Sequence, residues 1–176
     1  MTEKPSIWAG LSLEPAHIWH ILLAVWILVM FGHSMTPADL SSKESGSVLA
    51  FLCSMLEGAG IGSSWLTEHL VRKTAHFCEY GVFGLLLMKN FYLLQGRRGR
   101  GYRQSLTARF CPLVLAVLAV PFLDETIQSF SPGRSPQIGD VWLDMAGACC
   151  GLLAAAALKR LRGSYGHSRR RRRRFR

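Results

Sequence analysis

The 176-residue chain is long enough for one domain, and only 18% of its residues are charged, against roughly 25% in soluble domains. Its net charge of +10 lies in two blocks: residues 95–109 hold five Arg and residues 159–176 hold ten Lys or Arg, with no acid in either. This excludes a uniformly basic nucleic-acid-binding domain and a disordered chain, and five cysteines without a C-x-x-C pair exclude a disulfide scaffold or zinc ribbon.

Four segments are too apolar to be surface helices. They comprise residues 18–31, extendable to 35; residues 75–94; residues 110–123, extendable to 128; and residues 141–158. A helix of 18 to 20 residues covers roughly 27–30 Å, the thickness of the hydrocarbon core of a bilayer. Backbone groups in lipid must be hydrogen-bonded within the segment, which favours helices. The sequence therefore predicts an all-α, polytopic membrane protein with a four-helix transmembrane bundle.

Two other interpretations of these segments are weaker. A soluble four-helix core would need polar residues along one side of each helix, and residues 113–120 have none. A cleaved signal peptide at 18–31 would need a basic leader and a small-residue cleavage site, and neither is present. We therefore expect the first segment to be a membrane anchor.

The connection 36–74 between the first two spans is predicted to contain an amphipathic helix. Ser41 with Glu44 three residues later resembles a capping box, which would start the helix there. Val48, Leu52 and Met55 follow at helical spacing, and glycines from position 58 onward end the pattern. We expect this helix to lie at the outer membrane interface or over the bundle.

The basic blocks predict the orientation. Segments rich in Lys and Arg stay cytoplasmic, and an even number of spans between the two blocks puts both on one face. We expect a multi-pass protein of the cell membrane with both termini in the cytoplasm. Its parts would be a cytoplasmic segment 1–17, a transmembrane domain 18–158 and an Arg-rich cytoplasmic tail 159–176. Attraction of the tail to anionic lipids is adequate to explain its charge, and no nucleic-acid partner is expected.

Ionisable residues within spans are costly and usually functional or mutually paired. Here they gather near the outer ends of three predicted helices. The polar set is Arg72, Lys73, His76, Glu79 and Tyr80 at the outer end of the second helix, Asp124, Glu125 and Gln128 at that of the third, Arg134 in the following loop, and Asp140 and Asp144 at that of the fourth. For any one pair of opposite charges, a structural ion pair is the simpler interpretation. Convergence of the whole set predicts an outward-facing polar pocket instead.

Residue spacing supports this pocket. Arg72, His76, Glu79 and Tyr80 share one helical face, as do Asp124 with Gln128 and Asp140 with Asp144. The face that carries Asp140 and Asp144 continues into Gly147-x-x-x-Gly151, and these two glycines permit close approach of a neighbouring helix. Such an approach would bring the two Asp residues of the fourth span toward the other polar groups.

Three segments resemble the VanZ-like family of bacterial membrane proteins. They are VRKTAHFCEY (71–80), DETIQSFSPGR (124–134) and DVWLDMAG (140–147). The family pattern is met at Lys73, His76, Phe77, Tyr80, Asp124, Glu125, Gln128, Phe130, Pro132, Gly133, Arg134, Asp140, Asp144 and Gly147, although many members have Asn at the position of Asp144. The resemblance covers residues 20–158 and implies a membrane fold with a polar pocket. The family is named for a member associated with teicoplanin resistance, and most members have no assigned reaction.

The first functional hypothesis is a binding or protective protein that engages a cell-envelope component or a glycopeptide antibiotic. Arg72, Lys73 and Arg134 would hold phosphate or carboxylate groups. Glu79, Tyr80, Gln128, Asp140 and Asp144 would complete the ligand-binding set.

The alternative is an intramembrane enzyme acting on a lipid-linked or peptidoglycan-precursor substrate. His76 would act as acid or base with Asp124 or Glu125. A divalent metal held by His76, Glu79, Asp124, Asp140 and Asp144 is a further possibility, so the cofactor stays open. Transport ranks last because the acidic residues stop near one face.

Overall fold

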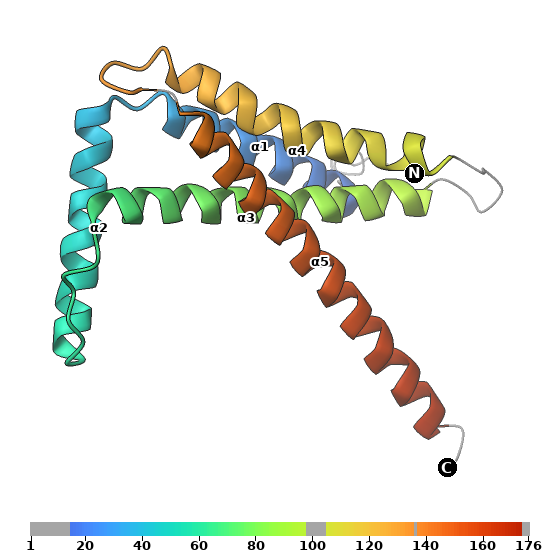
Figure 1. Cartoon of the computed structure of the whole chain (residues 1–176). Coiled ribbons are helices and arrows are strands. Elements are labelled where there is room, and N and C mark those ends of the chain that lie inside the picture. The colour runs from blue at the N-terminus through green and yellow to red at the C-terminus, as the bar shows by residue number, and fades with distance from the viewer. Residues whose placement is uncertain (1–14, 98–104, 136, 174–176) are drawn as a thin grey trace, which may run out of the picture.

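The computed structural model describes residues 15–97, 105–135 and 137–173, and the described residues form five helices (Figure 1). In chain order these are α1 (Pro15–Ser34), α2 (Ala38–Gly58), α3 (Glu68–Arg97), α4 (Leu106–Gln128) and α5 (Ile138–Arg173). Most of the predicted segment 1–17 lies outside the described residues, as do Arg98, Arg100 and Arg103 of the first basic block and Arg174 and Arg176 of the second. No strand occurs among the described residues, so the all-α prediction is confirmed.

Four of the helices, α1, α3, α4 and α5, are long and apolar enough to cross a membrane, which confirms the four predicted spans. Their surfaces are apolar, with Leu28 69%, Leu115 62% and Phe122 64% exposed. The interior holds carboxylates beside a small apolar core that includes Met30 and Phe83, because Asp124 and Asp144 are each 1% exposed. A soluble bundle would have the opposite distribution, so these helices are built to face lipid.

Two helices are longer than hydropathy predicts. α3 begins at Glu68 instead of residue 75, and α5 continues past residue 158 to Arg173. Hydropathy locates the apolar part of a helix, whereas Lys and Arg are good helix formers and extend the helix into polar surroundings. The additional turns of α3 carry Arg72 and Lys73 to the bundle.

The predicted capping box at Ser41 and Glu44 is wrong. α2 begins at Ala38, directly after Pro37, and has no side-chain cap. The Ala38 N–H instead donates to the Pro132 carbonyl oxygen at 3.1 Å, so a tertiary contact replaces the local one. In Figure 1, α2 runs across the direction of the other helices, at the end where α1 and α4 finish and α3 and α5 begin. We call this end of the bundle the polar end.

A glycine seam holds α3 against α5 where the two helices, which begin at the same end of the bundle, cross in Figure 1. A Cβ at Gly147 would overlap the carbonyl of Phe77, and one at Gly151 would overlap the carbonyl of Gly81. From the other side, a Cβ at Gly84 would overlap the backbone of Ala148. The close approach predicted from the small-residue stripe is thus present, and it sets the two helices backbone to backbone. At the opposite end of the bundle, Lys159 Nζ lies 3.4 Å from the centroid of the Tyr92 ring.

Candidate functional site

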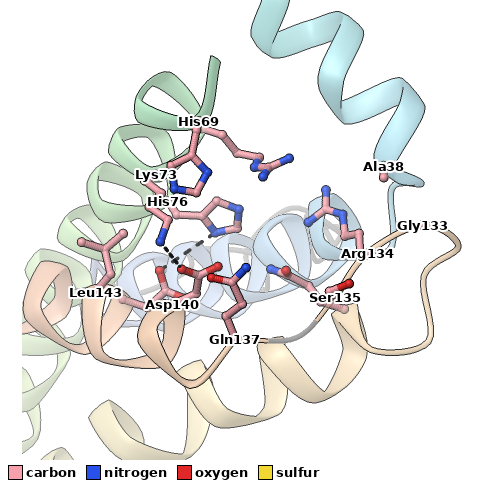
Figure 2. Close-up of a pocket in the computed structure, with 13 residues that line it drawn as sticks. Ala38, His69, Lys73, His76, Gly133, Arg134, Ser135, Gln137, Asp140 and Leu143 are labelled. Atoms are coloured by element: carbon pink, nitrogen blue, oxygen red, sulfur yellow. Dashed lines mark ion pairs between the residues drawn. The ribbon is translucent and has the colours of Figure 1, made fainter. Parts of the chain in front are cut away.

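A cavity of about 230 Å³ lies at the polar end. Figure 2 shows its residues converging from α2, α3, α4, α5 and the loop between α4 and α5. The lining residues are Ala38, His69, Arg72, Lys73, His76, Gln128, Gly133, Arg134, Ser135, Gln137, Asp140, Leu143 and Asp144. Seven residues proposed from the sequence are therefore brought together here: Arg72, Lys73, His76, Gln128, Arg134, Asp140 and Asp144.

The α3 and α5 wall of the cavity contains an ion pair. Lys73 Nζ lies 2.8 Å from Asp140 Oδ1, and the two side chains are 32% and 33% exposed, so the cavity reaches the protein surface here (Figure 2). The pairing follows from the glycine seam, which fixes the register of the first turns of α5 against those of α3. The charge of Lys73 is thereby partly neutralised by Asp140.

The deepest part of the site is formed by His76, Asp124 and Asp144. One ring nitrogen and one oxygen of each carboxylate lie within 4.8 Å of one another. His76 Nδ1 is 4.0 Å from Asp144 Oδ1, which is too long for a hydrogen bond. His76 and Asp144 line the cavity, and Asp124 lies behind them from α4.

The opposite wall is the loop after α4, which carries Arg134. Gly133 has φ +76°, a conformation that favours glycine, and a Cβ there would lie 3.1 Å from the Ala38 Cβ. In Figure 2, Arg134 points into the cavity from the side opposite Lys73 and His76. Burial lowers the pKa of the half-buried Arg134, and the positive charge of Arg72 lowers it further. Two guanidinium groups thus face the same small space.

Four proposed residues do not line this cavity. Asp124 lies behind it, as described, and Glu79 turns toward α1, where its Oε1 lies 2.9 Å from His33 Nδ1. Tyr80 is fully buried with its ring edge-on to Phe83, at 6.1 Å between centroids. Glu125 Oε1 accepts a hydrogen bond from the backbone N–H of Gln137. Glu79 and Glu125 therefore fasten α1 and the α4–α5 loop.

Sequence reasoning did not identify three residues of this region. His33 connects α1 to the site, since its ring is stacked on His76 at 6.2 Å between centroids and also lies 3.7 Å from Glu44. His69 precedes Lys73 by four positions on α3, so continuing the helical face back one turn would have found it. Gln137 gives no such signal, because it lies in a loop.

Some polar oxygens in the interior have no hydrogen-bond partner among the described residues. The carboxylates of Asp124 and Asp144, each 1% exposed, both have an unpartnered Oδ1. Asp140 Oδ1 lacks a hydrogen bond in the strict geometric sense but has the Lys73 ammonium at 2.8 Å. Unpartnered buried carboxylate oxygens are expensive, so the floor of the cavity is the least satisfied part of the bundle.

Comparison with known proteins identifies the family. No curated protein and no solved structure matches the chain. A family model described as VanZ/LLP1 matches residues 19–159, which include every cavity residue and all but a few terminal residues of the four spans. This multi-pass membrane protein therefore belongs to the VanZ/LLP1 family.

Proposed function

We propose that the cavity binds the anionic headgroup, a phosphate or carboxylate, of a cell-envelope component. The observation that carries this proposal is the pair of guanidinium groups of Arg72 and Arg134 in one half-buried space. Among the ion pairs of the described residues, none involves either arginine. Burial, and then the charge of Arg72, lower the pKa of Arg134, although the nearby carboxylates of Asp124, Glu125 and Glu44 oppose this. An anion between the two guanidinium groups would stabilise both charges, and guanidinium groups suit bidentate contact with phosphate or carboxylate.

The ends of the helices also favour an anion. α2, α3 and α5 begin at the polar end, and each contributes to the lining from its first two turns, at Ala38, His69 and Asp140. Unpaired N–H groups and the helix dipole give a helix N-terminus a partial positive charge. Two helix C-termini, of α1 and α4, lie at the same end, so the N-termini are in the majority.

Cavity size favours a headgroup over an entire glycopeptide antibiotic. The volume of about 230 Å³ is below the roughly 300–1,000 Å³ of sites for drug-sized molecules. One water occupies roughly 30 Å³, so a phosphate or diphosphate fits with several waters. A role in resistance to envelope-directed antibiotics would then act through the envelope component.

The proposal includes an orientation: both termini cytoplasmic and the cavity on the extracytoplasmic face, with residues 18–158 as the membrane domain. It rests on the basic residues 95–109 and 159–176, which border the ends of α3, α4 and α5 remote from the cavity. Alkaline phosphatase fused after Gly62 should be active in cells, and the same enzyme fused to the C-terminus should be inactive. The reverse pattern would contradict the orientation.

Binding is tested with full-length protein in detergent, titrated with inorganic phosphate and pyrophosphate in a calorimeter. We expect Arg134→Gln to abolish binding and Arg109→Gln to leave it unchanged, since Arg109 is exposed at the other end of α4. Equal binding by both variants would refute the role of the arginine pair. Expression of the wild-type protein should also change glycopeptide susceptibility, and expression of Arg134→Gln should not.

The second candidate function is enzymatic, and the placement of His76 favours it. His76 borders the cavity with Asp144 close to its Nδ1, an arrangement suited to proton transfer to or from a bound group. The sequence suggested Asp124 or Glu125 as the partner of His76. Glu125 accepts a hydrogen bond from the Gln137 backbone, so Asp124 is the better partner. The test is turnover of a lipid-linked diphosphate by wild type and His76→Ala. Equal rates above background would exclude His76 as the acid or base.

A further inference from the structure

We infer that His76, Asp124 and Asp144 form a binding site for a divalent transition-metal ion at the floor of the cavity. The sequence suggested five possible ligands, and the structure separates them. Asp140 is paired with Lys73 and Glu79 with His33, whereas the remaining three present donor atoms within 4.8 Å of one another. They come from α3, α4 and α5, so the fold assembles the site from three separate helices.

The two carboxylates supply a second, independent observation. Asp124 and Asp144 are each 1% exposed, and each has an Oδ1 with no hydrogen-bond partner in the described part of the chain. No ion pair of the described residues brings Lys or Arg to either of them. Buried charges are normally paired or coordinate metals, and one dication would balance the two carboxylates.

The geometry agrees with a small contraction around an ion. Metal–ligand bonds from His nitrogen and carboxylate oxygen are about 2.0–2.2 Å long, which places tetrahedral ligand atoms roughly 3.3–3.5 Å apart. The His76–Asp144 separation of 4.0 Å is slightly wider and exceeds hydrogen-bond length. Since no two of the three donor atoms are more than 4.8 Å apart, changes of at most about 1.5 Å, within reach of side-chain rotation, close the site.

The donor set indicates the class of metal. One imidazole nitrogen with two carboxylate oxygens suits Zn²⁺ or Mn²⁺, whereas Ca²⁺ and Mg²⁺ prefer oxygen ligands alone. His76 and Asp144 also line the cavity, so a remaining coordination position faces the space proposed to hold the anion. The stacked His33, tied to Glu79, supports the His76 ring from the side of α1.

Metal content of the purified full-length protein tests this inference without any anionic ligand. The protein is equilibrated with Zn²⁺ or Mn²⁺ in detergent, passed through a desalting column and analysed by mass spectrometry of the elements. We expect about one ion per chain. Substitution of a residue that only supports a metal ligand typically weakens metal binding roughly 10- to 100-fold. We expect at least this loss of metal affinity when a ligand itself is replaced, in each of the variants Asp144→Asn, Asp124→Asn and His76→Gln.

Glu125→Gln is the matched control, because it neutralises a buried neighbouring carboxylate yet keeps an acceptor for the Gln137 N–H. It should retain the metal. Loading with Co²⁺ gives a second measurement on folded protein: the visible absorption of a four-coordinate site, present in wild type and Glu125→Gln and absent in Asp144→Asn.

Absence of stoichiometric metal in the wild type, or equal metal in wild type and His76→Gln, would overturn the inference. Its failure is distinguishable from failure of the proposed function. Phosphate binding that depends on Arg134 with no metal bound would overturn only the metal site. Bound metal without phosphate binding would overturn only the anion proposal.

Discussion

The glycine seam makes a sharp prediction for Gly151→Ala. The added methyl group would overlap the Gly81 carbonyl oxygen and would lie 2.9 Å from the Leu85 nitrogen, closer than the 3.0 Å below which real contacts are essentially absent. All the atoms it meets belong to the α3 backbone, which cannot rotate aside as a side chain can. The two helices must therefore separate.

The size of the effect follows from this overlap. Restoring ordinary contact requires a displacement on the order of 1 Å, because carbon atoms pack at about 3.5–4.0 Å. Overpacking of this kind costs about 1–3 kcal/mol in the free energy of unfolding. At about 2–4 °C per kcal/mol for a chain of this size, the melting temperature should fall by about 2–12 °C. The Lys73–Asp140 contact, at 2.8 Å, should lengthen beyond hydrogen-bond range.

Thermal unfolding of detergent-purified protein, followed by tryptophan fluorescence, measures this change. Gly32→Ala is the matched control, since Gly32 lies on the membrane-spanning helix α1 and a Cβ there meets nothing within 4 Å. Since Ala favours the helix over Gly, its free energy of unfolding should equal that of wild type or exceed it by up to about 1 kcal/mol. If Gly151→Ala melted at the same temperature as Gly32→Ala, the close approach of α3 and α5 would be refuted.

Three further predictions concern polar groups. Because burial and Arg72 lower the pKa of Arg134, the unfolded chain holds more protons between the lowered and the ordinary pKa, so ligand-free stability should rise with pH across that window. Arg134→Gln should remove this rise and leave the melting temperature at neutral pH equal to that of the wild type or higher. It should also eliminate the stabilisation by phosphate, which in the wild type is roughly 2.7 kcal/mol at a phosphate concentration about 100 times the Kd. A lower melting temperature of the variant without phosphate would indicate that Arg134 forms a structural ion pair instead. Asn90→Leu should lower the free energy of unfolding, measured by thermal unfolding, by about 0.6–1.7 kcal/mol, because Asn90 Nδ2 donates a hydrogen bond to the Trp19 carbonyl oxygen at 2.9 Å and so joins α3 to α1. Met88→Leu, an apolar substitution on the same helix, is the control, and an equal loss in both variants would contradict this role of Asn90. Glu79→Ala should cost about 1–3 kcal/mol by loss of the His33 contact, and Glu79→Gln, which keeps an acceptor, should recover part of it in the same assay.

Hydropathy was sufficient to predict the spans, because a bilayer imposes one simple rule on composition and helix length. It could not predict the ends of α3 and α5, where charged residues continue the helix beyond its apolar part. The start of α2 was also beyond local rules. The Ala38 N–H is satisfied by Pro132, almost a hundred residues later, so no capping side chain is needed.

The site was partly predictable for a similar reason. Helical spacing places Arg72, His76 and Glu79 on one face, but it does not say which neighbouring helix each side chain meets. Glu79 lies close enough to α1 to contact His33, and this pairing removes it from the cavity. His33, a single histidine at the end of the first span, could not be recognised as part of the site from the sequence. Its role becomes visible only when the neighbouring helix α3 is known.

The seam between α3 and α5 has a consequence for ligand selectivity. Because backbone meets backbone there, the seam itself has no side chains to order, and the α3 and α5 backbones that carry the cavity wall stay in place when a ligand enters. The wall that carries Lys73, His76 and Asp144 is therefore preorganised, and binding loses little conformational entropy in ordering it. A rigid wall discriminates between ligands by their shape. Adding one group to a ligand that fits should therefore reduce its affinity more than removing one contact does.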